Sequence, residues 1–381
     1  MDFSLSEEER QIQKLARDFA RKEILPAAVH YDETATFPHP VVEKARELGL
    51  VSMAVPEEHG GIGLSPLGIA LVAEELAWGC AGIAVAITLN CLVADALGIA
   101  ASDEQKQIYY PRLAEGFGAY ALTEPGAGSD AAALQTRAVD MGDHYVLQGS
   151  KTWISHAPEA SFFVVFAKTD VEAGTRGITA FLVDRERPGV SVSKSIPKMG
   201  QRASSAAEVT FDQVEVPSNA VLGRTGEGFK IAMRVFDRSR PLVAAIAVGV
   251  ARRCLEESLR YATERKAFEQ PIAAFQGVGF KLAEMGMRTE AARLLTHKAA
   301  WKLGHHQGST LDAAYAKAFA ADTAMWAAVE AVQVHGGYGY SKEFPVEKLM
   351  RDAKVLQIYE GTSEIQRTIM VRELTRAVPP R

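Results

Sequence analysis

The first third of the chain places apolar residues at helical spacing. Ile12, Leu15, Ala16 and Phe19 recur after the sequence Ser6-Glu7-Glu8-Glu9, which has the form of a capping box. The stretch 82–99 is apolar nearly all round, which is typical of a buried helix. We therefore expect an all-helical domain over residues 1–118, with further helices at 41–48, 67–78 and 82–99 and another from residue 102.

Between Gly118 and Gly226 the pattern changes to short runs of β-branched and aromatic residues. Glycine and proline turns separate these runs, and no helical stretch lies between them. Short strands at such close spacing are typical of a small antiparallel barrel or sandwich. We predict this domain over residues 119–225, with strands at 145–147, 162–166, 178–183, 190–192 and 209–211.

The helical period returns after Gly226, in long alanine-rich runs. Glycine or proline marks several of the junctions, notably Pro271 and Gly336-Gly337. Long helices packed side by side form a bundle. Residues 226–381 are expected to form a four-helix-bundle-like domain, with helices at 229–236, 241–263, 275–303, 311–333 and 345–356. The fold class predicted for the whole chain is α+β with three domains.

Composition narrows the class of protein. A net charge of −5 and a pI near 6.0 argue against a nucleic-acid-binding protein and against one that binds anionic membranes. We expect no membrane span, because neither a signal peptide nor an apolar stretch of about 18 residues is apparent. Cys80, Cys91 and Cys254 stand in apolar helical runs without metal-ligand spacing. They indicate buried reduced thiols, a cytoplasmic protein and no metal site.

A carboxylate near the C-terminus is the first candidate for chemistry. Glu360 follows an apolar run that ends at Tyr359 and precedes a turn that begins at Gly361. A carboxylate held among apolar groups loses solvation, so its pKa rises and it becomes suited to proton abstraction. The alternative is an ordinary solvated turn residue, and this stretch taken alone favours that alternative.

A second candidate is the glycine-rich stretch YALTEPGAGSD, residues 120–130, where the helices give way to strands. Its glycines let the backbone approach a flat or phosphorylated ligand, and the hydroxyls of Thr123 and Ser129 can bond to the polar edge of that ligand. It is neither a Rossmann fingerprint nor a P-loop, because it lacks the third glycine and the Gly-Lys-Ser/Thr ending. A polar interdomain loop is an equally good interpretation of this stretch alone.

Seven motifs together resemble those of the acyl-CoA dehydrogenases. They follow that family's order and cover essentially the whole chain, which chance resemblance does not explain. The helix–strand–helix layout also matches the fold of that family. The motifs are YALTEPGAGSD (120–130), KTWIS (151–155), MGQR (199–202), FDRSRP (236–241), ERKAF (264–268), QVHGGYGY (333–340) and RDAKVLQIYEGTSEIQR (351–367).

The resemblance implies an FAD-dependent enzyme with Glu360 as its catalytic base. In the family this base removes the α-proton of an acyl-CoA thioester, and the β-hydrogen leaves as hydride to flavin N5, giving the trans-2-enoyl-CoA. The base residue's own backbone N–H and a flavin ribityl hydroxyl polarise the thioester carbonyl. In the isovaleryl and long-chain branches the glutamate stands instead at a position that is Ser239 here, and serine cannot serve as a base. The resemblance therefore favours the short- and medium-chain branch.

The resemblance also implies which residues hold the cofactor and the substrate. In the family, a loop and a strand line the flavin, and the turn after the base lies against the cofactor. Further positions hold the pyrophosphate and the adenine end of FAD, partly from a neighbouring subunit. The residues expected to bind FAD are Tyr120, Leu122, Thr123, Gly128, Ser129, Trp153, Ile154, Ser155, Arg265, Phe268, Gln276, Gln333, Gly336, Gly337, Thr362 and Glu364. The residues expected to bind the substrate are Ser129, Asp237, Arg238, Arg240, Tyr359 and Gly361.

The expected partners are an acyl-CoA, an electron-transfer flavoprotein that accepts the electrons, and further copies of the chain in a homotetramer, a dimer of dimers. One alternative is an enzyme that reoxidises its flavin with O2, but such relatives usually carry an extra C-terminal domain. Another is a non-catalytic acyl-CoA- or flavin-binding homologue, against which the retained Glu360 argues.

Two positions depart from the family's usual pattern. His156-Ala157 stands where the family usually has Asn-Gly, and Phe268-Glu269 stands where it usually has Phe-Gly. A carboxylate at Glu269 would repel the cofactor's phosphates unless it points to solvent. Outside the site, Arg252-Arg253 is expected to lie on a solvated helix face and not in a ligand site, and an interface role stays open.

Overall fold

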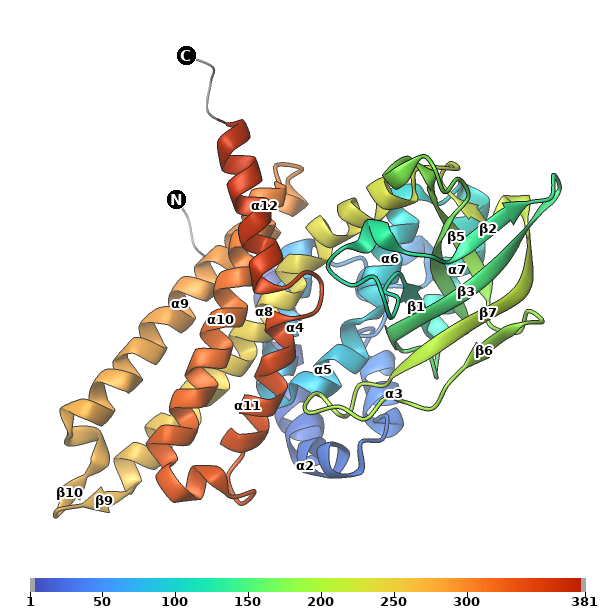
Figure 1. The fold of residues 1–381 in the computed structure, drawn as a ribbon. Coiled ribbons are helices and arrows are strands. Elements are labelled where there is room, and N and C mark those ends of the chain that lie inside the picture. Colours follow the sequence, from blue (N-terminus) through green and yellow to red (C-terminus); the bar gives the residue numbers. More distant parts are fainter. Residues whose placement is uncertain (1–3, 378–381) are drawn as a thin grey trace.

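The computed structural model describes residues 4–377, and its elements follow the predicted order of helices, strands and helices (Figure 1). The first helix and the seventh begin where capping chemistry predicts: the Ser6 and Ser102 hydroxyls accept hydrogen bonds from Glu9 N–H and Gln105 N–H, and both capping boxes are complete. The sequence pattern did not predict α2, which continues from α1 through a π-helical segment, Ala20–Ile24. The helices of this part are α1 (Glu7–Phe19), α2 (Leu25–Thr34), α3 (His39–Glu47), α4 (Pro66–Gly79), α5 (Ala81–Thr88), α6 (Asn90–Ala100) and α7 (Asp103–Glu115).

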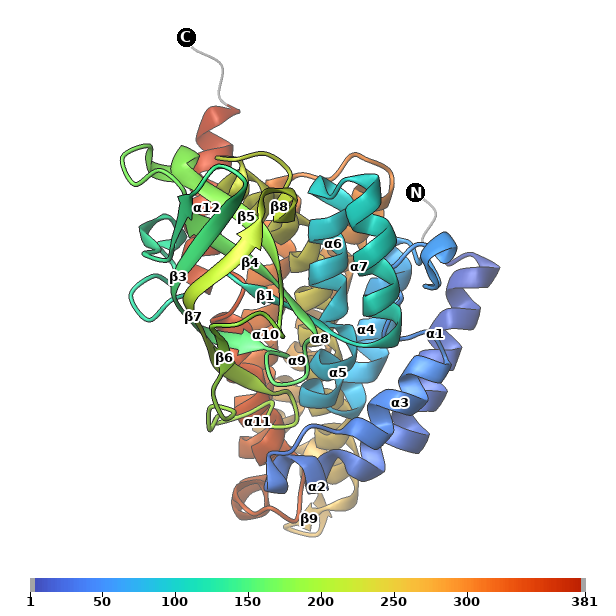
Figure 2. The same ribbon diagram turned by 90° about the vertical axis from the view of Figure 1, so that its right-hand side faces the viewer.

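The apolar stretch Ala81–Ala100 forms part of the protein core. By length and composition it could cross a membrane, so the expectation that no such stretch is present was wrong. It is divided at Leu89 between α5 and α6, however, and 72% of its most apolar window is buried inside the protein. Figure 2 shows both helices between the strands on one side and α1 on the other. The burial predicted for this stretch is thus confirmed.

The strand domain is one sheet in the order β6-β7-β3-β2-β4-β5-β8, with β1 pairing β4. Most neighbours are antiparallel, as predicted, but β1 and β2 each pair with β4 in parallel. A pattern of short runs suggests hairpins, which are antiparallel, whereas long crossovers allow parallel pairs. The strands are β1 (Gly118–Ala121), β2 (Arg137–Asp140), β3 (His144–Ser155), β4 (Phe162–Lys168), β5 (Ile178–Asp184), β6 (Val190–Val192), β7 (Ala206–Pro217) and β8 (Val221–Leu222).

The C-terminal helices form a bundle around one long helix, α8. The helices predicted at 229–236 and 241–263 are a single helix that runs through Pro241. A proline inside a helix costs about 3 kcal/mol, but Pro241 is buried and the helix continues through it. The helices are α8 (Gly228–Glu264), α9 (Gln276–Gly304), α10 (Thr310–His335), α11 (Val346–Lys354) and α12 (Ser363–Arg376), and a hairpin of β9 (Lys266–Ala267) and β10 (Gln270–Pro271) links α8 to α9.

Two hydrophobic cores join these parts. One core packs α4 and α5 against α8 and α10, with Leu71, Leu76 and Ile246 buried in it. The other packs β4 and β5 against α6 and the beginning of α8, with Phe166 and Val235 among its members. Helix α8 is therefore shared by both cores: its beginning packs against the sheet, and the rest of it lies in the core of the bundle.

A group of buried charges lies where α4 meets α8 and α9. Arg252 pairs with Glu74 at 2.9 Å and with Glu75 at 2.7 Å, while Arg253 is buried and pairs with Glu257 at 2.7 Å. The expectation of a solvated face at Arg252-Arg253 was wrong. Two adjacent arginines on a helix resemble a surface pattern. The packing of α4 against α8 brings Glu74 and Glu75 to Arg252, whereas Arg253 pairs with Glu257 one turn further along α8.

Candidate active site

The candidate base stands in a turn with an unusual backbone. A 3-10 turn, Val355–Gln357, follows α11, and Thr362 caps α12 by accepting a hydrogen bond from Ile365 N–H at 3.2 Å. Between them Glu360 and Gly361 have φ angles of 51° and 92°, in the left-handed region. That conformation costs a non-glycine residue roughly 1–3 kcal/mol, so neighbouring groups must hold it in place.

Side chains from three helices hold this turn by its carbonyl oxygens. Lys317 of α10 donates a hydrogen bond to the Gly361 carbonyl at 2.7 Å, and Gln366 of α12 donates to the same oxygen at 3.0 Å. The Glu360 carbonyl accepts from Gln366 at 3.3 Å and from Arg240 of α8 at 3.5 Å. The turn is thus tied to α8, α10 and α12, which are distant from one another in sequence.

The carboxylate of Glu360 is partly buried and faces α8. The Ser239 hydroxyl donates a hydrogen bond to its Oε2. Burial is the largest influence on the pKa of Glu360 and raises it above the usual value for a glutamate. The Ser239 hydrogen bond and the positive charges of Arg240 and Lys317 act in the opposite direction without cancelling the effect of burial. This environment differs from that of the solvated turn residue which the sequence left open.

Strand β1 brings a predicted cofactor residue close to this carboxylate. The ring of Tyr120 packs against Phe166 and Phe236, with centroid distances of 5.0 and 6.0 Å. Burial and the charge of Glu360 together raise the pKa of Tyr120 well above its usual value. Glu360, from the C-terminal helices, and the end of β1, from the strand domain, therefore share one site.

The glycine-rich stretch and the KTWIS motif lie side by side in the fold. Thr152 N–H donates to the Thr123 carbonyl at 2.9 Å. The fully buried ammonium of Lys151 donates to the carboxylate of Glu124 at 2.7 Å and to the Leu122 carbonyl at 3.1 Å. The motifs did not predict this buried pair, although Glu124 and Lys151 both belong to them. It fixes the glycine-rich loop against β3, so the loop is part of the site and not a free interdomain linker.

The surface beside this loop suits a flat aromatic cofactor. Trp153 has a φ of 59° and is 57% exposed, while the adjacent Ile154 is buried. A Cβ built at Gly126 or Gly128 would meet nothing within 4 Å, so the loop leaves open space above the strand. An exposed indole beside open backbone is a stacking surface for an isoalloxazine ring. These residues fit the flavin end of FAD.

The residues predicted for the adenine end lie elsewhere in the same chain. Arg265, Gly336 and Gly337 line a cavity of about 540 Å³ beside the β9–β10 hairpin. Figure 1 shows that hairpin at the far end of the bundle from β1 and β3. Gln276 begins α9, and Gln333 lies near the end of α10, both in this region. Within one chain, the two sets of predicted FAD residues therefore lie apart from each other.

The departure at Glu269 is accommodated by the hairpin. Phe268 and Glu269 form its two-residue turn, with φ angles of 49° and 68°. Both side chains are exposed, and Phe268 is 89% exposed. The carboxylate of Glu269 therefore lies at the tip of a turn, in solvent, where its charge is screened.

The departure at His156 places an imidazole among buried aromatic rings. His156 is fully buried, and its ring lies 4.7 Å from the ring of Phe117 and 5.7 Å from that of Phe37. Burial lowers the pKa of His156 to about 3, so its imidazole is neutral at physiological pH. The residue acts as an aromatic packing group between the strand domain and the N-terminal helices.

The residues expected to bind CoA already have partners. Asp237 accepts hydrogen bonds from Arg240 at 3.0 Å and from Thr310 at 2.6 Å. Arg238 pairs with Asp95 of α6. Arg240 is buried and donates a hydrogen bond to the Glu360 carbonyl. In this structure it therefore stabilises the Glu360 turn, in addition to its predicted role in binding the substrate.

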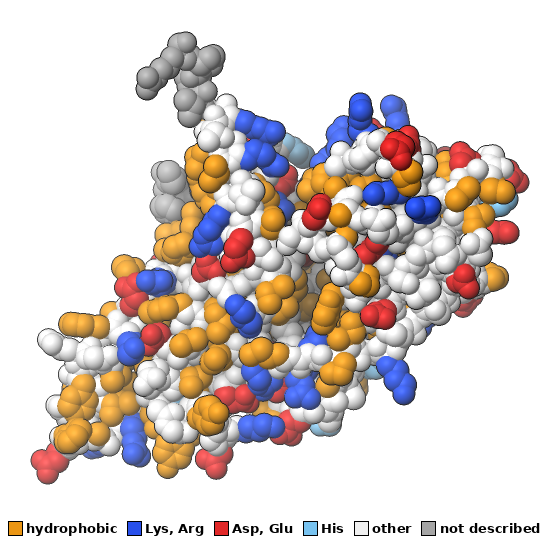
Figure 3. All heavy atoms as spheres, viewed as in Figure 1, with side chains coloured by type: hydrophobic (Ala, Val, Ile, Leu, Met, Phe, Trp, Pro, Cys, Tyr) orange, Lys and Arg blue, Asp and Glu red, His pale blue; other side chains and the backbone are white. Residues whose placement is uncertain are grey.

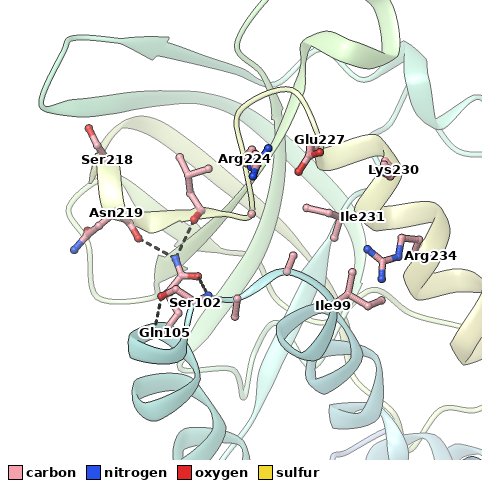
Figure 4. Close-up of a pocket in the computed structure, with 14 residues that line it drawn as sticks. Ile99, Ser102, Gln105, Ser218, Asn219, Arg224, Glu227, Lys230, Ile231 and Arg234 are labelled. Atoms are coloured by element: carbon pink, nitrogen blue, oxygen red, sulfur yellow. Dashed lines mark hydrogen bonds between the residues drawn. The ribbon is translucent and has the colours of Figure 1, made fainter.

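A separate cavity of about 560 Å³ lies between the end of α6, the beginning of α7, β8 and the beginning of α8 (Figure 4). Gln105 crosses its floor and donates to the carbonyls of Asn219 and Val221, each at 2.9 Å. Its lining includes the exposed cations Arg224 and Arg234 but none of the residues predicted to bind cofactor or substrate within residues 4–377. We assign the candidate site to Glu360 and not to this cavity.

The helical domain, the strand domain and the helical bundle meet at a partly buried carboxylate and an open flavin-stacking surface. This combination defines a flavin-dependent oxidoreductase. Models of the N-terminal, middle and C-terminal domains of acyl-CoA dehydrogenases match residues 6–117, 119–214 and 226–375. The chain belongs to the acyl-CoA dehydrogenase family.

Individual relatives agree over their full length. A probable acyl-CoA dehydrogenase of Bacillus subtilis (strain 168) is 43% identical over 381 residues, which covers 99% of this chain and 100% of that protein. The structure of butyryl-CoA dehydrogenase from Megasphaera elsdenii superposes with a TM-score of 0.96 at 40% identity, covering 99% of this chain and 100% of that one. A chain in the structural work on the electron transferring flavoprotein of Acidaminococcus fermentans matches with a TM-score of 0.96 at 41% identity. The match covers 99% of this chain and 100% of that one.

Proposed function

We propose that this protein oxidises an acyl-CoA thioester to the trans-2-enoyl-CoA, with Glu360 as the base that removes the α-proton. The observation that carries this proposal is the environment of Glu360: a carboxylate with a raised pKa, fixed by Ser239 and facing the region where the flavin-stacking residues lie. A base of raised pKa is better matched to a weakly acidic carbon than a solvated carboxylate is. When bound, FAD supplies the hydride acceptor for the β-carbon.

The residues around the base have separable roles in this proposal. The left-handed turn directs the Glu360 side chain toward α8, and its N–H is available for the thioester carbonyl. Tyr120, which packs against Phe236, is the partly buried aromatic group whose pKa the charge of Glu360 raises. Trp153, Thr123 and Ser129 would hold the flavin end of the cofactor, and Asp237 and Arg238 stand where the CoA part would pass.

The substrate class and the electron acceptor follow from similarity to named proteins. We infer a short acyl group because a butyryl-CoA dehydrogenase covers nearly the whole chain at 40% identity. We infer an electron-transfer flavoprotein as acceptor because a chain studied together with such a flavoprotein is equally similar.

The test is anaerobic mixing of the FAD-loaded protein with acyl-CoAs of increasing length, followed by flavin absorbance. Bleaching that is fastest with a short chain supports the proposal. Bleaching with none of the thioesters would leave a protein that binds flavin without this activity. Reoxidation of the bleached protein by O2 faster than by an electron-transfer flavoprotein would indicate an oxidase instead.

We further propose that the chain acts as a homotetramer. Phe280, Met287, Leu294 and Trp301 stand seven residues apart along α9, and their exposed fractions are 67%, 62%, 47% and 45%. This spacing places large apolar side chains along one face of the helix, as in a helix–helix seam. Figure 3 shows many apolar side chains on the surface of the bundle. A neighbouring copy that covered this face would also account for the separation of the two ends of the predicted FAD site.

Leu294→Glu is expected to shift the tetramer toward smaller species and to weaken FAD retention. The substitution places a charge in the centre of the apolar face of α9, where a partner helix would desolvate it. Sedimentation velocity together with the flavin-to-protein absorbance ratio measures both effects. Ile108→Glu is the matched control, because Ile108 is also an exposed apolar residue, at 55%, but lies on α7. An unchanged sedimentation coefficient for Leu294→Glu would refute an α9 interface.

A further inference from the structure

Lys317 is a buried cation that the expected chemistry does not use. It lies in the alanine-rich helix α10, and its side chain is 0% exposed. Its one hydrogen bond within residues 4–377 is the 2.7 Å contact with the Gly361 carbonyl. An ammonium group removed from water is costly unless charges or hydrogen bonds compensate it, so its position needs a reason.

The charges around Lys317 come from each element that meets the turn. Glu360 is the strongest of its acidic neighbours, and Asp322 of α10 and Glu364 of α12 add weaker attraction. Arg240 of α8 repels it. Burial lowers the pKa of Lys317 to about 8, so the side chain still carries its charge at neutral pH. The attraction is mutual, because the charge of Lys317 also favours the ionised form of Glu360.

We propose that Lys317 is a positioning residue for Glu360: it fixes the Glu360-Gly361 turn through the Gly361 carbonyl and places a positive charge beside the base. The hydrogen bond fixes the peptide plane that follows Gly361, and Gln366 and Arg240 fix the preceding plane through the Glu360 carbonyl. These contacts hold Glu360 in its left-handed conformation, from which its carboxylate reaches Ser239. This inference rests on the proposed role of Glu360 and adds a residue to it.

The charge and the hydrogen bond of Lys317 have different consequences, which substitutions can separate. Lys317→Met removes both while keeping a long unbranched side chain. Lys317→Gln removes the charge but keeps an N–H donor. Without the positive charge of Lys317, the ionised form of Glu360 is less stable relative to the protonated form. The pKa of Glu360 therefore rises.

The experiment measures the rate of anaerobic flavin bleaching by butyryl-CoA between pH 5.5 and 9 in the FAD-loaded tetramer. Both variants are expected to move the acidic limb of the pH profile to higher pH. At a pH on that limb, their bleaching rate should therefore be about tenfold lower than that of the wild type, which is a part of the effect of a general base. Lys317→Met is expected also to lower the rate on the plateau, because the turn loses its tether. Lys302→Met, which removes one lysine from α9 where it pairs with Asp312, should leave the profile unchanged.

Two contradicting outcomes are distinguishable. If the wild-type flavin is not bleached by any acyl-CoA, the proposed function fails before the variants are compared. If the wild type is bleached and Lys317→Gln keeps the wild-type acidic limb, the inference about Lys317 is overturned, whatever the plateau rate. Infrared titration of the Glu360 carboxyl band, identified by its loss in Glu360→Gln, gives a readout independent of turnover: the band should titrate at higher pH in both variants. This readout also applies if Lys317→Met folds poorly, because Lys317→Gln retains the donor.

Discussion

Glu360→Gln is expected to bind FAD as the wild type does and to bleach it with acyl-CoA at least about 10³-fold more slowly, within the range that general bases contribute. The amide has nearly the shape of the carboxylate and can still accept the Ser239 hydrogen bond. It cannot take up a proton, so the α-proton of the thioester has no acceptor. Stopped-flow absorbance at the flavin maximum measures the rate, and the flavin spectrum before mixing shows whether the cofactor is retained.

Glu172→Gln provides the matched control. Glu172 is exposed in the loop between β4 and β5, so its substitution removes one carboxylate outside the predicted site. It should leave the bleaching rate within a few-fold of the wild type. A Glu360→Gln protein that bleached as fast as Glu172→Gln would show that another group removes the proton.

The wild-type rate should also depend on pH in a defined direction. Burial raises the pKa of Glu360, and only the ionised form is a base. The rate is therefore expected to rise with pH through a limb that lies above the usual range for a glutamate, and to reach a plateau beyond it. Ser239→Ala should move this limb further toward alkaline pH, because the Ser239 hydrogen bond favours the carboxylate.

Glu74→Ala is expected to lower the free energy of unfolding by about 3–5 kcal/mol, which is the effect of breaking a buried ion pair by removing one partner. Glu74 is 2% exposed and lies 2.9 Å from Arg252 and 3.1 Å from Arg293. Removing this side chain takes one carboxylate partner from each of the two guanidinium groups at the junction of α4, α8 and α9. Urea unfolding at saturating FAD, followed by far-UV circular dichroism, measures the loss as a lower midpoint.

Glu43→Ala is the matched control for this effect. Glu43 pairs with Arg46 at 3.3 Å, but its side chain is 60% exposed. Exposed pairs contribute about 0–1 kcal/mol, so its midpoint should be close to that of the wild type. Equal losses for both substitutions would contradict a special role for the buried charges.

Acid should remove the contribution of Glu74. Burial by itself raises the pKa of this carboxyl, but the nearby His297 ring, whose Nε2 lies 3.7 Å away, and the charges of Arg293 and Arg252 outweigh it and hold the pKa at about 2, below the usual 4.5. A carboxyl whose pKa is lower in the folded protein stabilises it above pH 4.5, and this stabilisation is lost as the pH falls toward 2. The difference in unfolding midpoint between wild type and Glu74→Ala should therefore be largest at pH 7 and shrink between pH 4.5 and 2.

The sequence by itself determined the order of the elements and much of the site. Periodicity is a local property, so the capping boxes at Ser6 and Ser102 and the change to strands after Gly118 could be found without the fold. The motifs placed Glu360, the glycine-rich loop and the KTWIS strand in one family before any geometry was known. Local sequence could not decide whether Glu360 is solvated, because desolvation comes from groups distant along the chain.

Only the tertiary structure decided which polar groups are buried and what they meet. Lys317 lies 43 residues before Glu360 and Lys151 lies 27 residues after Glu124, yet each lysine is fully buried against its partner segment. Nothing in an alanine-rich helix or a strand distinguishes such a lysine from one on the surface. The continuity of α8 through Pro241 and the burial of Arg253 have the same origin. In each case the local pattern favoured a break or a surface, and packing between distant segments supplied the free energy that overcame it.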